Sequence, residues 1–144
     1  MNISKLFYPI KFLVNSIALG LIQVLSLMLG MFFVTVPLLI VFLATLKYAP
    51  KQFLLIHLWS LVPTIMGLAF LVWGAYWYQK VGKGEIWQGN VLSIAFWITV
   101  IVALSLIFLF REHWKFFVPL IANEVWFASV CCSWSGMCIY NVWL

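Results

Sequence analysis

Residues 12–46 read FLVNSIALGLIQVLSLMLGMFFVTVPLLIVFLATL, a run of 35 residues without Asp, Glu, Lys, Arg or His. Its only strongly polar members are Asn15 and Gln23. The hydrocarbon core of a bilayer is about 30 Å thick, and a helix of about 20 apolar residues crosses it. A soluble domain has no interior that hides such a run. The sequence therefore predicts an integral membrane protein.

The run is longer than one upright span requires. At about 1.5 Å per residue it forms a helix about 52 Å long, yet it is too short for two spans and a turn. Pro37 lacks the backbone N–H that the interior of a helix uses. We therefore expect a long first helix that is kinked or tilted near Pro37.

The composition of the whole chain agrees with a membrane location. Of 144 residues, 67% are hydrophobic and 8% are charged, and the mean hydropathy is +1.16, whereas about a quarter of residues are charged in soluble domains. The net charge of +5 is spread over short segments, which favours anchoring at lipid headgroups and argues against nucleic acid as a partner.

Three more apolar segments follow the first, and short connections separate them. Short connections make consecutive helices antiparallel neighbours. We therefore expect a single membrane domain over residues 1–144, an all-α antiparallel bundle of four transmembrane helices. The expected segments are an interfacial lead-in at 1–11 and spans at about 12–46, 52–78, 86–110 and 116–140.

Small residues recur at helical spacing on three of the spans, and small residues let helices approach closely in lipid. In the fourth span they lie on two opposite sides, so this span is expected to pack between other helices of this chain or of a partner. The residues expected at helix contacts are Ser16, Gly20, Gln23, Gly30, Ser60, Gly67, Gly74, Ala122, Ser129, Ser133 and Gly136.

The orientation of the spans does not follow from charge. The segments on each side of the membrane carry four basic residues, so the positive-inside rule favours neither orientation. An even number of spans with a short N-terminal lead favours both termini on the cytoplasmic side of a multi-pass protein.

Two histidines and two of the three acidic residues fall on one predicted membrane surface. His57 and Glu124 lie inside the second and fourth spans, and His113 lies in the connection between the third and fourth. An ionisable residue inside a span is costly and usually faces the bundle interior with a partner. Glu124 is therefore the most informative polar residue.

Three interpretations of the His57, His113 and Glu124 cluster remain open. It can be a structural network of ion pairs and hydrogen bonds. It can bind a quinone, haem or lipid headgroup, because a neutral imidazole ligates haem iron or hydrogen-bonds a carbonyl. It can also relay protons or ions through Glu124. Bound lipid is expected in any case.

The sequence contains none of the usual catalytic motifs, such as HExxH, CxxC or GxSxG. Cys131, Cys132 and Cys138 match no usual metal-binding spacing and are interpreted as small hydrophobic side chains. The leading hypothesis is a small non-catalytic subunit, for assembly or stabilisation, of a larger membrane complex, with electron transfer or energy conversion as the narrower guess. The alternatives are a quinone- or haem-binding redox protein and a small oligomeric transporter or channel.

Overall fold

The computed structural model describes residues 3–48, 58–79 and 85–140, and every regular element in these ranges is helical. One helical turn at residues 58–60 precedes α4. The helices are α1 (Ile3–Gly30), α2 (Phe32–Tyr48), α4 (Val62–Gln79), α5 (Ile86–Leu109), the 3-10 turn η2 (Arg111–His113) and α6 (Trp114–Tyr140).

Among the described residues, four helical stretches are long and apolar enough to cross a membrane, judged by length and composition. This confirms the all-helical class and the number of candidate spans that the sequence predicts. The stretches are Ile10–Gly30, Leu58–Trp77, Ile86–Leu109 and Arg111–Tyr140.

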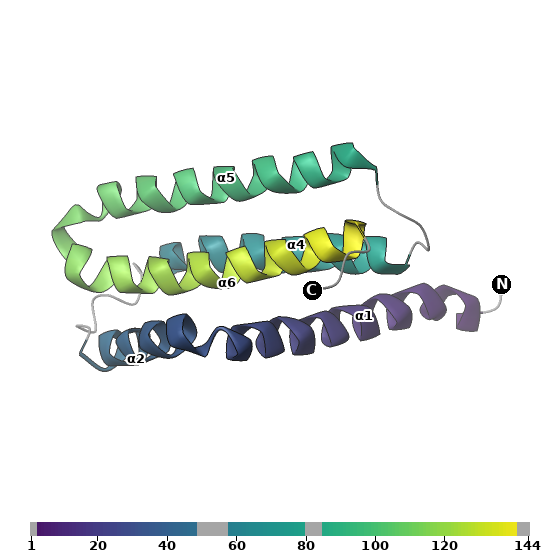
Figure 1. Cartoon of the computed structure of the whole chain (residues 1–144), viewed down its shortest axis with the longest axis horizontal. Helices are drawn as coiled ribbons and strands as arrows, with labels where there is room; N and C mark the ends of the chain where they lie inside the picture. Colours follow the sequence, from purple (N-terminus) through teal and green to yellow (C-terminus); the bar gives the residue numbers. More distant parts are fainter. Residues whose placement is uncertain (1–2, 49–57, 80–84, 141–144) are drawn as a thin grey trace.

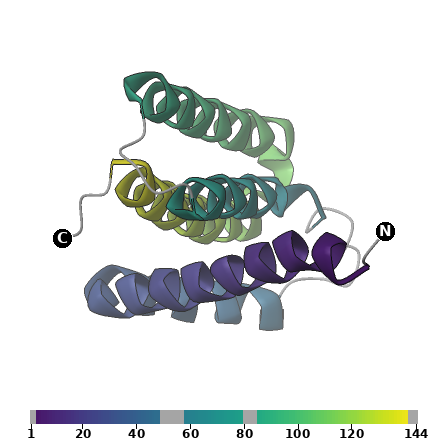
Figure 2. The ribbon, with the colours of Figure 1, turned by 90° about the vertical axis from the view of Figure 1, so that its right-hand side faces the viewer.

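The helices lie in three layers (Figures 1 and 2). One outer layer is α5, the middle layer is α4 beside α6, and the other outer layer is α1 with α2. Helix α6 packs against α1, α2, α4 and α5, and its contact with α4 is the most extensive in the described chain. The central position of α6 agrees with the small and polar residues on two of its sides.

The direction of the helices follows from close contacts. Gly67 and Gly74 of α4 lie against Ala128 and Ser135 of α6, so residue numbers rise together and the two helices are parallel. Two consecutive pairs, α4 with α5 and α5 with α6, do contact each other. However, the closest neighbours are two helices that α5 separates in the chain.

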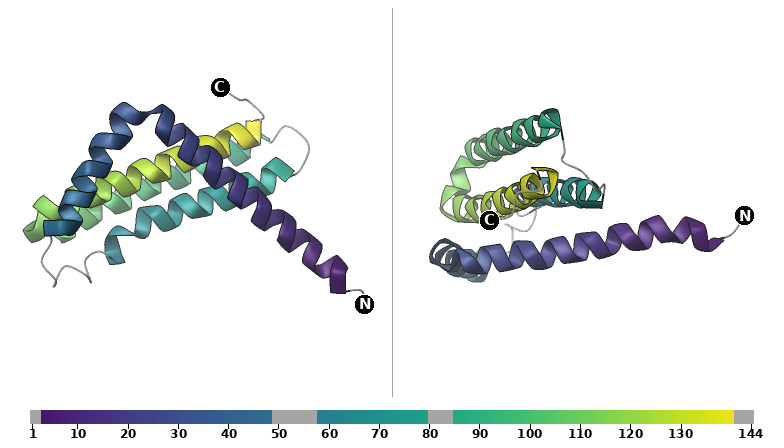
Figure 3. Two further views of the ribbon diagram at one scale, coloured as in Figure 1. Left: turned by 90° about the horizontal axis from the view of Figure 1, so that it is seen from below. Right: turned by 45° about the vertical axis from the view of Figure 1, so that its right-hand side comes forward.

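The predicted kink near Pro37 is wrong in position. The first apolar run breaks at Met31, and α2 continues through Pro37. Figure 3 shows α1 and α2 as two arms of an angle, which is how the excess length of this run is accommodated. Pro37 removes only the one ladder bond to the carbonyl of Phe33.

The break at Met31 has a local cause and specific hydrogen bonds. Gly30 is a poor helix former and is the last residue of α1. The Met31 N–H donates to the Leu27 carbonyl at 3.0 Å, and the Met31 carbonyl accepts the N–H of Thr35 at 3.1 Å. The Thr35 hydroxyl donates to the Met28 carbonyl at 2.7 Å, so it satisfies a carbonyl that the end of α1 leaves open.

The expected lead-in also differs from the structure. Helix α1 begins at Ile3 and passes through Pro9, so residues 3–11 of the predicted lead-in are continuous with the helix of the first apolar run. Pro9 lies within the first two turns of α1, where it removes the donor of a single ladder bond.

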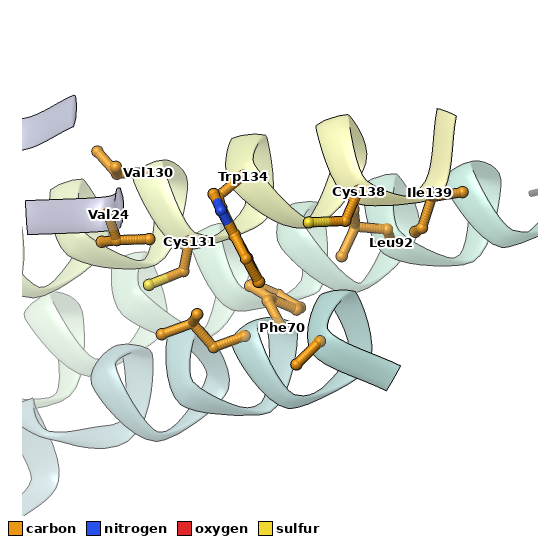
Figure 4. Close-up of a cluster of buried hydrophobic side chains, with 10 residues drawn as sticks. Val24, Phe70, Leu92, Val130, Cys131, Trp134, Cys138 and Ile139 are labelled. Carbon is orange, nitrogen blue, oxygen red and sulfur yellow. The ribbon is translucent and has the colours of Figure 1, made fainter. Parts of the chain in front are cut away.

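Two groups of buried apolar side chains hold the layers together. The larger one contains Trp134 and Cys131 of α6, Phe70 of α4 and Val24 of α1 (Figure 4). The smaller one, around Phe117 of α6, joins α5 to α6. Cys131 and Cys138 are buried free thiols and Cys132 is a half-buried one, in agreement with their interpretation as small hydrophobic side chains.

Candidate functional site

The candidate site lies in the contact between α4 and α6, which we call the α4–α6 seam. Gly67 and Gly74 contribute to it from α4, and Glu124, Ala128 and Ser135 contribute from α6. A Cβ on Gly67 would stand 3.0 Å from the Cα of Ala128, and one on Gly74 would stand 2.7 Å from the Cα of Ser135. The two backbones therefore approach as closely as glycine allows.

Two serine side chains on these helix faces are buried, and the hydroxyl of Ser135 has hydrogen-bond partners. The Ser135 hydroxyl is fully buried and lies within hydrogen-bond distance of the Phe70 carbonyl on α4. It also lies 2.8 Å from the carbonyl of Cys131 on its own helix. Ser60, which the sequence places on the same face of the second span, is 2% exposed.

Glu124 is the exception in the seam. It lies one turn before Ala128, and its side chain is only 7% exposed. No basic group or hydrogen-bond donor among the described residues pairs with its carboxyl. A carboxyl group in such a position is costly because burial disfavours its charged form unless something neutralises it.

A second buried polar atom without a partner lies at the same level. The Thr64 hydroxyl oxygen is buried and has no hydrogen-bond partner within the described ranges. Thr64 comes three residues before Gly67, and Glu124 comes four residues before Ala128. Because Gly67 contacts Ala128 in a parallel pair, the two positions differ in height by only about 1.5 Å.

The structure does not bring His113 to Glu124. His113 is exposed in η2, at the end of the molecule where α2 also ends (Figure 1). His113 precedes Glu124 by eleven positions, a distance of about 16 Å along the axis. His57 lies outside the described residues. A quinone or haem site formed by these three residues stays a prediction.

Of the residues of α1 that are predicted at helix contacts, three lie against other helices and one does not. Ser16 and Gly20 are buried, and a Cβ on Gly20 would stand 2.7 Å from the Trp134 ring. Gln23 accepts a hydrogen bond from the indole N–H of Trp134. Gly30 is exposed, and a Cβ there would meet no atom within 4 Å. It therefore lies beside the break in the first run and makes no close contact with another described helix.

The second small-residue stripe of α6 is only partly covered. A Cβ on Gly136 would stand 3.9 Å from the Leu92 side chain of α5, and Ala122 is half-buried. Ser129 is half-buried and Ser133 is exposed, and both line a pocket of about 170 Å³ with Leu27, Met31 and Trp126.

A larger apolar groove of about 730 Å³ lies between α1 and α4. Leu13, Ala69, Val72, Trp73, Tyr76 and Trp77 line it. This groove is where we expect bound lipid, because its walls are apolar and aromatic.

Sequence reasoning missed the polar contacts that join the layers. Trp126 donates its indole N–H to the Thr35 hydroxyl at 3.2 Å, and Trp134 donates to Gln23. A buried indole N–H needs an acceptor, and the first apolar run offers few side-chain acceptors. Because acceptors are so few in this run, the need of each buried indole for an acceptor could have predicted these pairs from the sequence.

Comparison with protein-family models, with curated proteins and with solved structures finds no match for this chain.

Proposed function

We propose that this chain crosses a bilayer through four helices and serves as a non-catalytic subunit, for assembly or stabilisation, of a larger membrane protein complex. The apolar side chains that point outward support the membrane location. Phe33, Ile22, Ile86 and Phe108, for example, are each more than 60% exposed. A soluble protein with so much exposed apolar surface would aggregate.

The observation that carries the role of a subunit is the uncovered small-residue stripe of α6. Ser133 is exposed in the C-terminal third of this helix, and its hydroxyl bonds back to the Ser129 carbonyl at 2.9 Å. The hydroxyl is thus satisfied within the helix, which leaves a smooth surface. Such a surface admits a second helix at close range and gives lipid chains little to pack against. The open pocket beside it supports docking of a helix from another subunit.

Native mass spectrometry of the protein extracted in mild detergent tests this proposal. We expect a defined complex that contains at least one other integral membrane protein. A monodisperse preparation of the single chain would contradict the proposal. A complex of identical copies alone would instead favour the alternative of a small oligomeric transporter or channel.

A pair of matched serine variants tests the docking face. Ser133→Ile adds bulk to the uncovered stripe and is expected to reduce recovery of the complex several-fold, because it blocks close helix approach. Ser105→Ile on α5 is the control, since Ser105 is also exposed and its hydroxyl also bonds to the carbonyl four residues before it, at 2.8 Å. Equal recovery of the complex with both variants would exclude the α6 stripe as the docking face.

We place both termini on the cytoplasmic side. The start of α1 and the end of α6 lie at the same end of the molecule (Figure 1), which supports a common side for the two. Reporter fusions at each terminus check this, and a translocated N-terminus would overturn it.

A further inference from the structure

The α4–α6 seam contains a buried carboxyl group that has no partner among the described residues. Glu124 is 7% exposed and makes no hydrogen bond or ion pair with a described residue. An isolated carboxylate in an apolar interior carries a penalty large enough that it must be neutralised by a bound positive charge. Its isolation therefore indicates a ligand.

The helices around Glu124 offer no described group for that purpose. Helix α5 has no ionisable side chain and α4 has only tyrosines. The basic residues described on the remaining elements packed against α6, and on α6 itself, are all exposed: Lys11, Lys47, Arg111, His113 and Lys115. On α6 the nearest titratable side chain on the same stripe is Cys131, two turns further along.

The start of α4 and the turn before it offer two oxygen atoms for such a site. The Thr64 hydroxyl is buried, lies at the level of Glu124 and has no partner within the described residues. Pro63 has no N–H, so the Trp59 carbonyl loses its helical donor. Pro63, toward whose nitrogen a helical Trp59 carbonyl points, is fully buried. An interruption also occurs at Leu61, between the turn 58–60 and α4, and carbonyls at interrupted helices bind small cations in transporters.

We propose that the Glu124 carboxyl, the Thr64 hydroxyl and the Trp59 carbonyl form an occluded binding site for one small monovalent cation, either a proton or a sodium ion. One carboxylate neutralises one positive charge, so a divalent ion would leave a net charge buried. The Glu124 side chain is only 7% exposed, which leaves little of its surface to a lysine or arginine from a partner. The site does not depend on membership of a larger complex, so the two proposals fail separately.

Labelling with dicyclohexylcarbodiimide tests the site in the full-length protein in detergent. This apolar reagent takes the proton of a carboxylic acid onto nitrogen while the carboxylate oxygen bonds to its central carbon. We expect one adduct, mapped by mass spectrometry to Glu124, that forms more slowly as the pH is raised. Glu85 and Glu112 are exposed and serve as internal comparisons, because water hydrolyses the activated ester there.

A second series distinguishes the two cations. At constant pH and ionic strength, replacing choline chloride by sodium chloride slows the labelling several-fold if the site takes sodium. If labelling depends on pH alone, the site takes a proton. Labelling of Glu124 that depends on neither pH nor sodium, or no labelling at any pH, overturns the proposal.

Threonine variants test the composition of the site. Thr64→Val is expected to shift the half-protecting concentration of the cation at least about threefold, because one oxygen is lost. Thr64→Ser retains the hydroxyl and restores the original value, which separates loss of a ligand from loss of folding. Thr99→Val on α5 is the matched control, since this buried hydroxyl already donates to the Ala95 carbonyl at 2.8 Å. An equal shift for Thr64→Val and Thr99→Val contradicts the assignment.

Discussion

At the scale of single residues, the surroundings of a glycine decide what it contributes. Gly74 and Gly30 both lie in helices within the apolar segments. A Cβ on Gly74 would stand 2.6 Å from the Ser135 Oγ, whereas a Cβ on Gly30 would meet no atom within 4 Å. Gly74 therefore permits the α4–α6 seam, and Gly30 only lowers the helical preference at the end of α1.

Alanine at these two positions should have opposite effects on stability. Gly74→Ala is expected to lower the free energy of unfolding by about 1–3 kcal/mol, because the backbones must separate. Gly30→Ala should leave it unchanged or raise it by up to about 1 kcal/mol. Thermal unfolding in detergent, followed by tryptophan fluorescence, measures both. Equal melting temperatures for the two variants would contradict the seam geometry.

At the scale of elements, the break between α1 and α2 shows how polar contacts select a bend. The Trp126 indole donates to Thr35, and the Thr35 hydroxyl lies 2.7 Å from the Met28 carbonyl. These bonds satisfy groups that a broken helix leaves open, and inside an apolar environment such groups are costly when unsatisfied. Proline alone does not localise the bend, because its missing N–H removes one bond while the helix continues on both sides.

The angle between α1 and α2 should therefore depend on Thr35 and be insensitive to Pro37. Thr35→Val removes both bonds of the hydroxyl and is expected to cost about 1–3 kcal/mol and to broaden the distribution of distances between the two helices. Pro37→Ala is the control and should leave the mean distance unchanged. The distance between the two helices is measured with spin labels, introduced through unnatural amino acids at the exposed positions Leu19 and Leu43. A shift with Pro37→Ala alone would restore proline as the cause.

At the scale of the whole molecule, α6 is the structural centre. It contacts each of the other long helices in the described chain, and its buried residues run from Phe117 to Ile139. By contrast, Thr45 is the buried residue of α2. Contact density of this kind sets which segments open locally.

The rate of amide hydrogen exchange should be lowest in the helix with the most buried residues, α6, and higher in α2. Amides in the centre of α6 are expected to exchange most slowly, and those of α2 at least about tenfold faster, which corresponds to about 1.4 kcal/mol in opening free energy. Mass spectrometry of the protein in lipid nanodiscs measures the rates, and α5, which packs on α6 along one side, should lie between. Exchange in α2 as slow as in α6 would contradict the central role of α6.

Sequence reasoning reached the helices and the candidate site only in part. The third and fourth spans were predicted at about 86–110 and 116–140, and α5 and α6 cover 86–109 and 114–140. Glu124 was singled out because an acid among apolar residues is unusual. Its neighbours were not found. The sequence places His113 on the same predicted membrane surface, but His113 is about 16 Å away along the helix axis. Thr64 comes from a helix that is distant in the chain.

The sequence by itself determined that the described chain is helical and which stretches are long enough to span a membrane. The physical reason is that an apolar run of such length has no other way in lipid to satisfy its backbone hydrogen bonds. Only the tertiary structure decided the parallel α4–α6 contact, the break at Met31 and the isolation of the Glu124 carboxyl. A small-residue stripe fits several neighbouring helices, so the choice among them depends on the packing of all the layers together.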